Sequence, residues 1–430
     1  MINTDIAIIG AGFAGIAAGY AAKEKNLQAT LFEADVEWGG LCGNFSVDGF
    51  RFDRAVHLAF NEPPIVERLF LSRPHYSHSS ESRNYADGFW VRHPVQNNLR
   101  ELPVEERIKV ICSFIGRPNS IDFGGHNNYR QWLEFQFGQY FAEKYPARYT
   151  RKYWGTDAAN LNCNWCGGRI YQPSIEEVLR GAFSDSPKPA NVYYAKSMHY
   201  PKEGGYKNFV AELAAQIDIC CGHKVTAIDT TEKILTFANG KTCHYKKLVS
   251  TMPLPRLAKL ITNDEKILAA ADNLQTTSMA LVSVGYSKAF DFPTNWFYVY
   301  DEDIPFARVH SPSRKSPDNA PQGCSSLQFE IYYSRELPLK LSDDELITKT
   351  LDAMEKMDVA TRADVAALDC RHVEFANVIF YDGMEQAREL VRREVARHGI
   401  TSCGRFGEWD YLWSTQSFMS GYNSMQEGFQ

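Results

Sequence analysis

The sequence predicts an α/β fold in which a parallel βαβ unit opens the chain, is interrupted by an inserted region and is completed near the C-terminus. Three observations predict this fold. Residues 5–35 have the pattern of strand, glycine turn, helix and strand, residues 223–257 alternate like strands, and residues 400–430 add a strand and a helix. Between these segments, helical periodicity over 100–150 and strand alternation over 275–335 indicate an α+β insertion.

Composition indicates a globular protein. Of the 430 residues, 44% are hydrophobic and 23% are charged, and the net charge is -6. This charge provides no general basic surface, so nucleic acid is not an expected partner. Ten irregularly spaced cysteines favour a reducing, cytoplasmic location over a disulfide framework. Cys163 and Cys166 form a lone CxxC pair without the four ligands of a zinc site, so no metal is expected.

The apolar run over residues 6–22 has to be weighed as a membrane segment. It contains four glycines, follows Asp5 and has no basic leader. A membrane-spanning helix needs about 20 predominantly apolar residues, and a signal peptide needs a positively charged start. We therefore expect no transmembrane segment here.

The glycines of this run have the spacing of a dinucleotide-binding turn. Gly10 allows the tight turn, Gly12 allows the backbone to approach a pyrophosphate, and Gly15 allows the helix to pack closely on the strand. The helix N-terminus then presents free N–H groups to the anion. Glu33 ends the second strand, where a carboxylate can bind the ribose hydroxyls of an adenosine. The alternative is a glycine-rich turn without a ligand.

The segment that follows resembles a second glycine motif of FAD enzymes. In "EWGGLCGNFSVDGFRFDRAVHLAF", Gly39 and Gly40 precede a short hairpin that leads to His57. This resembles the amine oxidase, protoporphyrinogen oxidase and UDP-galactopyranose mutase group. The resemblance implies a Rossmann-like FAD/NAD(P)-binding domain with an inserted α+β substrate or cap domain. It also implies that Gly39 and Gly40 lie against FAD and His57 lies under the isoalloxazine ring, although a core histidine remains an alternative.

Further FAD contacts are implied by the same resemblance. "HKVTAIDTTEKILTFANGKTCHYKKLVSTMPLPRL" is similar to the family's strand segment that passes the adenine, and "MHYPKEGGYKNF" to its glycine turn near the flavin. "ITSCGRFGEWDYLWSTQSFMSG" is similar to its last FAD motif. The residues implied are Val225, Gly204, Gly205, Gly404, Arg405 and Gln416.

Substrate contacts are implied by shorter matches to the mutases. Tyr149 and Trp154 in "ARYTRKYWG" are similar to an aromatic pair that flanks a nucleotide-sugar pocket, and Tyr411 is retained beside them. The catalytic positions implied are Arg169, Arg308 in "IPFARVHSPS" and Tyr381 in "VIFYDG". A guanidinium binds phosphate oxygens through a planar fork. The alternatives are aromatic core residues at a helix end and a surface salt bridge.

The resemblance has one clear departure. After the Gly-Arg strand the mutases have a turn with two acids, whereas this chain has Trp413 and Thr415 in "EWDYLWSTQSF". The strand around 282–285 also lacks the arginine that the mutases place there. We therefore expect an altered sugar pocket on an unaltered flavin frame.

The implied domains are discontinuous. The FAD-binding domain is expected at 1–75, 200–265 and 360–430, a largely helical cap at 76–199, and an antiparallel substrate sheet at 266–359.

The resemblance implies a cytoplasmic flavoenzyme that isomerises the ring of a nucleotide sugar between pyranose and furanose forms for cell-surface polysaccharide biosynthesis. The reaction proceeds through N5 of reduced flavin and needs an external reductant. The alternative is an FAD-dependent oxidoreductase of the amine oxidase or protoporphyrinogen oxidase type, and a third possibility is a flavin-binding protein without catalysis.

Overall fold

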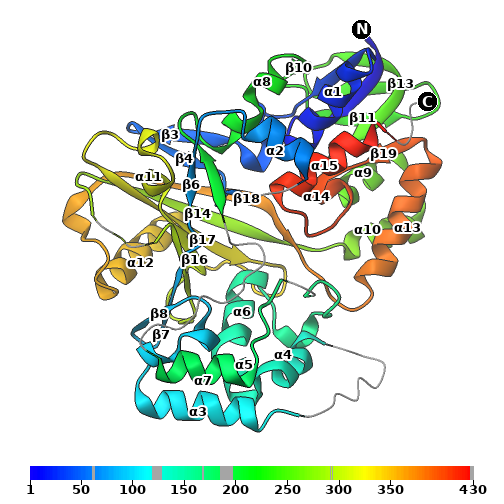
Figure 1. Ribbon diagram of the computed structural model, residues 1–430. Helices are drawn as coiled ribbons and strands as arrows, with labels where there is room; N and C mark the ends of the chain where they lie inside the picture. The colour runs from blue at the N-terminus through cyan, green and yellow to red at the C-terminus, as the bar shows by residue number, and fades with distance from the viewer. Residues whose placement is uncertain are drawn as a thin grey trace.

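The computed structural model describes residues 1–60, 63–118, 128–166, 169–184, 197–290, 292 and 294–426. Three parts follow one another along the long axis of the molecule (Figure 1). A first sheet with α1 and both termini lies at one end, a second sheet lies in the middle, and the helices α3 to α7 lie at the other end. Within the described ranges, no helix is long and apolar enough to cross a membrane.

The first sheet has seven strands in the order β10-β2-β1-β13-β12-β11, with β19 also paired to β13. β1 pairs in parallel with β2 and β13, and its Ile6, Ala7 and Ile8 are almost completely buried. An apolar run of this kind is typical of a parallel strand that is covered on both faces. The strands are β1 (Ile2–Ile9), β2 (Ala29–Phe32), β10 (Asp218–Cys220), β11 (Val225–Asp229), β12 (Ile234–Phe237), β13 (Thr242–Ser250) and β19 (Ile400–Ser402).

Helices from both ends of the chain pack against this sheet. α1 lies directly on α15, and a Cβ added to Gly421 of α15 would lie 1.9 Å from the Ala14 carbonyl oxygen of α1. α13 begins just after Asp382 and is followed by Gly399 at a φ of 70°. The helices are α1 (Phe13–Glu24), α8 (Ala211–Ala214), α9 (Leu254–Ile261), α10 (Glu265–Asn273), α13 (Met384–Arg397), α14 (Gly404–Gly407) and α15 (Ser414–Ser424).

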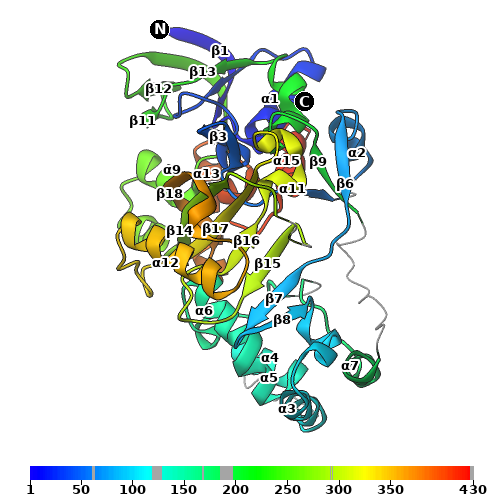
Figure 2. The same ribbon diagram turned by 90° about the vertical axis from the view of Figure 1, so that its left-hand side faces the viewer.

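The second sheet also has seven strands, in the order β18-β14-β17-β16-β15-β7-β8. The expected strands of 275–335 form its centre, and α11 (Pro312–Lys315) and α12 (Asp343–Lys356) lie beside it (Figure 2). Buried apolar side chains of β14, β17 and α12 share one core cluster. The strands are β18 (Val365–Val378), β14 (Thr276–Tyr286), β17 (Ser325–Tyr333), β16 (Arg308–His310), β15 (Trp296–Val299), β7 (Arg83–Ala86) and β8 (Phe89–Arg92).

The strands at the two edges of this sheet come from segments that the expected domain division placed elsewhere. β7 and β8 come from the segment expected to be largely helical, and β18 comes from the segment expected in the cofactor domain. β7 joins the sheet because it pairs in parallel with β15, with Asn84 opposite Tyr298. β18 pairs with β14 along most of its length. Pairing between segments so far apart in the sequence leaves no local signal.

The helical end agrees with the periodicity of 100–150. Its core contains the edge-on and tilted rings of Phe114, Phe137 and Phe141. A π-helical turn over Glu143–Ala147 surrounds Pro146, whose missing N–H interrupts regular helical bonding. The helices are α3 (Val104–Ile115), α4 (Tyr129–Phe137), α5 (Gln139–Ala142), α6 (Arg148–Trp154) and α7 (Ile175–Phe183).

Smaller elements connect these parts and position His57. The expected hairpin turn is present, with Asp48 and Gly49 at φ values of 48° and 85°. His57 lies in the loop between β4 of this hairpin and β5 of a three-stranded sheet. These elements are β3 (Asn44–Val47), β4 (Phe50–Asp53), β5 (Ala59–Phe60), β6 (His75–His78), β9 (Met198–Pro201), α2 (Pro64–Phe70) and the 3-10 turns η1 (Gly40–Cys42) and η6 (Tyr206–Val210).

Candidate active site

A single continuous cavity of about 960 Å³ connects the glycine turn of the first sheet to the helical end. Its walls come from β1, the 33–42 segment, the His57 loop, β15, α6 and the 404–417 segment. The volume is in the range of cavities that hold a cofactor or a drug-sized ligand.

The glycine turn forms one end of this cavity. Gly10 has a φ of 95°, and a Cβ on Gly15 would lie 1.9 Å from the Gly10 carbonyl oxygen, so Gly15 lets α1 pack on the turn. Gly12, Phe13 and Ala14 line the cavity, and α1 has no side-chain cap at its N-terminus. The N–H groups of a helix start that lacks a side-chain cap bind anions such as phosphate.

The Gly39–Gly40 pair packs against the first glycine turn. Gly39 has a φ of 126° and Gly40 a φ of 56°, and the Gly39 N–H donates to the Ala11 carbonyl oxygen at 2.8 Å. A Cβ on Gly40 would lie 3.2 Å from the Gly12 Cα. The two turns therefore form a narrow cradle of bare backbone at the cavity wall. An extended, anionic cofactor fits this cradle.

Glu33 and Val225 lie at the same end. The Glu33 carboxylate accepts hydrogen bonds from the Ala11 N–H at 2.8 Å and the Asp35 N–H at 2.9 Å, which fix its position at the cavity. Val225 begins β11 and also lines the cavity. The structure thus brings the predicted ribose and adenine contacts together, and the contacts themselves stay predictions.

His57 lines the middle of the cavity as a neutral ring. Its ring stacks on Tyr206 with centroids 5.1 Å apart, and its Nδ1 lies 3.1 Å from the Ala55 carbonyl oxygen. Because a carbonyl oxygen only accepts, Nδ1 carries the proton. Burial lowers the pKa of His57 to about 4.

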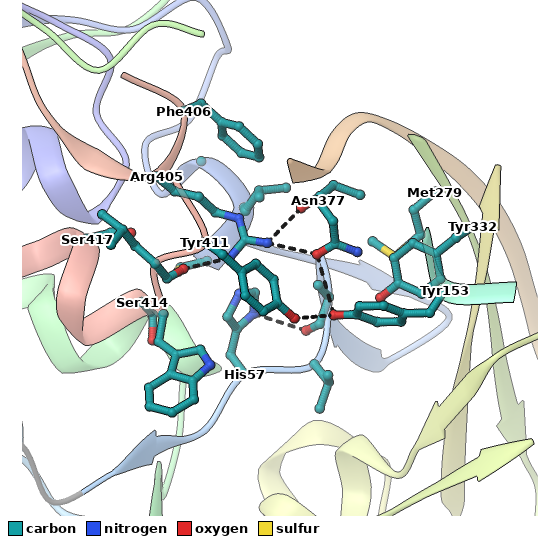
Figure 3. A pocket seen from close by; sticks show the side chains of 18 of the residues that line it. His57, Tyr153, Met279, Tyr332, Asn377, Arg405, Phe406, Tyr411, Ser414 and Ser417 are labelled. Carbon is teal, nitrogen blue, oxygen red and sulfur yellow. Dashed lines mark hydrogen bonds between the residues drawn. The ribbon is translucent and has the colours of Figure 1, made fainter. Parts of the chain in front are cut away.

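Arg405 ties two walls of the cavity together. It donates to the Leu412 carbonyl oxygen at 2.6 Å. It also donates to Asn377 Oδ1 at 2.8 Å, as Figure 3 shows. Gly404 precedes it at a φ of 80°, and a Cβ there would lie 2.7 Å from the Ala14 Cβ. Arg405 therefore holds the 411–413 turn against the end of β18.

Aromatic rings line the other end of the cavity. Tyr153 and Tyr411 meet there through their hydroxyl groups at 2.9 Å (Figure 3), and Tyr149 stacks on Tyr153 at 5.4 Å. Trp154 lies 5.3 Å from the Tyr411 ring. The aromatic lining residues of this end are Tyr129, Phe137, Phe141, Tyr145, Tyr149, Tyr153, Trp154, Trp165, Tyr171, Trp296, Tyr298, Tyr300, Tyr332, Tyr411 and Trp413.

Two predicted arginines lie among these rings. Arg169 donates to the Tyr411 carbonyl oxygen at 2.5 Å, and its guanidinium lies 4.4 Å from the Tyr411 ring and 4.7 Å from the Trp413 ring. Arg308 donates through Nε to the Glu330 carboxylate at 2.5 Å and through Nη2 to the Tyr332 hydroxyl at 3.2 Å. The predicted Arg308 is thus inside the cavity and also belongs to a buried ion pair.

Two predicted cofactor glycines lie outside the cavity lining, and their contacts with the cofactor stay predictions. Neither Gly204 nor Gly205 lines the cavity. The Gly204 carbonyl oxygen accepts from Asn44 Nδ2 at 2.7 Å, and a Cβ on Gly205 would lie 2.2 Å from that nitrogen. Both glycines have positive φ values, and the missing side chain of Gly205 lets the chain pack closely on the β3–β4 hairpin.

Gln416 and Tyr381 also lie outside the cavity lining, and their predicted roles stay predictions. Gln416 Oε1 accepts from the Trp413 N–H at 2.9 Å, so its side chain caps α15 instead of lining the cavity. The Tyr381 hydroxyl donates to the Asn273 carbonyl oxygen outside the cavity. The polar group of each side chain is already bound to nearby backbone.

Several lining residues were missing from the sequence analysis. Tyr153, Tyr298 and Tyr332 follow strand or helix periodicity that reads as ordinary core, and Asn377 lies at the end of a strand that was not assigned to the site. His93 follows β8 and carries no motif. No signal in the sequence would have separated them from structural residues.

Comparison with known protein families shows to which family the chain belongs. Residues 126–404 match the flavin containing amine oxidoreductase family, and residues 8–71 match the NAD(P)-binding Rossmann-like domain. The chain belongs to the flavin containing amine oxidoreductase family. It is therefore an enzyme of the oxidoreductase or isomerase class, built on a Rossmann-like domain with an additional α/β domain.

Solved structures share the whole fold. Reduced UDP-galactopyranose mutase matches with a TM-score of 0.91 at 23% identity, over 99% of this chain and 94% of that chain. A putative protoporphyrinogen oxidase from Exiguobacterium sp. 255-15 matches with a TM-score of 0.75 at 17% identity, over 98% of each chain. Wild-type putrescine oxidase bound to putrescine matches with a TM-score of 0.66 at 14% identity, over 99% of each chain. At these identities the likeness shows the fold alone.

Proposed function

We propose that the protein binds FAD at the glycine end of the cavity and isomerises the sugar ring of a nucleoside diphosphate sugar at the aromatic end. The flavin has to be in its reduced form before this redox-neutral reaction begins, and the product supplies cell-surface polysaccharide. FAD is supported by the cradle of Gly12, Gly39 and Gly40 and by Glu33 at its side. Family membership supports the flavin.

The main support for the substrate proposal is the positive charge at the aromatic end of the cavity. Arg169 and Arg308 both face this end, whereas Glu33 is the one carboxylate among the described residues that line the cavity, and it lies at the glycine end. Two guanidinium groups suit a diphosphate, and many aromatic faces suit a nucleobase. A cationic amine would find no carboxylate on the lining of this end.

The residues of the chain supply binding and orientation in this proposal. Arg169 and Arg308 hold the diphosphate, and the tyrosine and tryptophan rings pack against the base. Reduced flavin, when bound, supplies the nucleophilic N5 for the anomeric carbon. The reaction consumes no net electrons, so a reductant is needed only to keep the flavin reduced.

An FAD-dependent oxidation of the amine oxidase or protoporphyrinogen oxidase type is the second candidate. It is favoured by the family match and by two features of the cavity. The charge of Arg308 is shared with Glu330, and Tyr381 lies outside. Both features weaken the anion site that a nucleotide sugar requires.

Binding measurements on the FAD-loaded protein distinguish the two candidates. Dithionite-reduced and air-oxidised samples are titrated with UDP-galactose, UDP and putrescine, and turnover is followed by product analysis. We expect UDP-galactose to bind, with higher affinity for the reduced sample, and to be converted to a ring isomer. Absence of UDP-galactose binding in both states, together with oxygen consumption on an amine, would overturn the proposal in favour of the oxidase.

The arginines give a matched test of the binding mode. Arg169→Lys keeps the positive charge but loses the planar fork and the stacking, so we expect weaker UDP binding. Arg180→Lys, on the exposed Glu176 pair of α7, is the control and should leave UDP binding unchanged. Equal affinities for all three proteins would exclude Arg169 from the anion site.

A further inference from the structure

His93 is a cavity residue that none of the predicted motifs contains. It follows β8, lines the cavity and packs its ring against Tyr298 with centroids 4.9 Å apart. Tyr298 lies opposite Arg308 in the register of β15 and β16. His93 therefore lies one ring away from the arginine assigned to the diphosphate.

Asn84 fixes the protonation of this ring. His93 Nδ1 lies 3.1 Å from Asn84 Oδ1, and Asn84 Nδ2 donates to the Val91 carbonyl oxygen at 3.3 Å. Turning the amide around would place two acceptor oxygens together at Val91, in a side chain that is fully buried. The amide oxygen therefore faces His93, and since it only accepts, His93 Nδ1 carries the proton.

The second ring nitrogen is then an unprotonated acceptor. Burial lowers the pKa of His93 to about 4, so the ring is neutral near pH 7. In the described part of the chain, Nε2 has no hydrogen-bond partner, while the ring itself lines the cavity. A neutral imidazole with Nδ1 bound in this way offers the Nε2 lone pair to a ligand.

We propose that His93 Nε2 accepts a hydrogen bond from a hydroxyl group of the substrate sugar. This proposal rests on the proposed function. Arg169 and Arg308 only donate, so they select phosphate oxygens, and sugar hydroxyls need acceptors as well. His93 supplies such an acceptor beside the diphosphate site, and Asn84 acts as its positioning residue.

Nitrogen NMR of the FAD-loaded protein tests the state of the ring without any substrate. Protein labelled with ¹⁵N-histidine is compared with His93→Gln to assign the two ring signals. We expect a protonated Nδ1 and an unprotonated Nε2 that stay constant from pH 8 to pH 6. Asn84→Leu should populate the other tautomer. A protonated Nε2 in the unsubstituted protein would overturn the assignment.

Binding variants test the sugar contact. His93→Phe should weaken UDP-galactose binding by about threefold to tenfold, the range of one net hydrogen bond, and leave UDP binding unchanged. His93→Gln places an acceptor near Nε2 and should restore most of the affinity. His244→Gln, on the exposed face of β13, is the control.

The outcomes separate the two proposals. Equal weakening of UDP and UDP-galactose by His93→Phe, or no weakening, would overturn the sugar contact. If the unsubstituted protein binds no UDP-galactose, the proposed function is wrong and the sugar contact is wrong with it. The nitrogen spectra decide the tautomer in either case.

Discussion

Glu330 is joined to Arg308 by a buried ion pair at the wall of the cavity. The carboxylate also accepts from the Val56 N–H at 3.0 Å and from the Tyr332 hydroxyl at 2.8 Å. Glu330 is completely buried, while 20% of the Arg308 side chain is exposed toward the cavity. One carboxylate thus connects the His57 loop to the arginine of the aromatic end.

Removal of Glu330 should destabilise the protein strongly. Glu330→Ala leaves a buried guanidinium without its partner, and such changes cost about 3–5 kcal/mol of the free energy of unfolding. Urea unfolding of the FAD-free protein measures this loss. Glu176→Ala removes the exposed partner of Arg180 and should cost no more than about 0.5 kcal/mol. If Glu330→Ala loses as little free energy of unfolding as Glu176→Ala, the Glu330 pair adds little stability.

Gly12 and Gly15 should respond differently to a methyl group. A Cβ on Gly12 has no neighbour closer than 3.9 Å and would extend into the cavity, so Gly12→Ala should fold but retain little flavin. A Cβ on Gly15 would lie 1.9 Å from the Gly10 carbonyl oxygen, so Gly15→Ala should lose stability as well. The visible absorbance of the purified protein and its melting temperature separate the two effects. Full flavin content in Gly12→Ala would contradict the cradle.

The first glycine turn was predictable because the interactions that form it are local in the sequence. The tasks of Gly10, Gly12 and Gly15 depend on a strand, a turn and a helix that follow one another in the chain. The pairing of Arg308 with Glu330 depends instead on the register of β16 and β17, where the two residues lie opposite each other. The state of His93 depends on a cross-strand amide. These relationships arise only when distant segments pair.

Four residues implied by the resemblance do not line the cavity, and their cofactor and substrate contacts stay predictions. Tyr381 and Gln416 occupy positions in the sequence that match the family's motifs. Hydrogen bonds to nearby backbone groups hold their side chains outside the cavity. Gly204 and Gly205 form the expected turn, and the neighbour that leaves no room for a side chain on Gly205 is the β3–β4 hairpin. The motifs therefore predicted the backbone conformation better than they predicted which residues line the cavity.

The low pKa of His57 should make stability depend on pH. The ring ionises near pH 6.5 when unfolded and near pH 4 when folded, so only the unfolded chain takes up the proton between these values. His57 therefore does not change the free energy of unfolding with pH above about pH 6.5. Below that pH it lowers the free energy of unfolding progressively toward pH 4, by about 3 kcal/mol in total. His57→Gln should flatten this part of the pH profile, measured by urea unfolding of FAD-free protein. His244→Gln is the control, and an unchanged slope in His57→Gln would contradict the assignment.

Trp413 should act through Arg169. The guanidinium lies 4.7 Å from the Trp413 ring and 4.4 Å from the Tyr411 ring, so Trp413→Ala removes one of its two aromatic faces. A cation–π contact contributes about 0.5–2 kcal/mol, so we expect UDP affinity to fall by about twofold to thirtyfold with unchanged flavin content. Trp413→Phe should keep most of the affinity. Trp38→Ala removes a comparable contact with Lys207 and serves as the control, since neither residue lines the cavity. If Trp413→Ala and Arg169→Lys weaken UDP binding independently, so that their free-energy effects add in the double variant, the two side chains do not act as one unit.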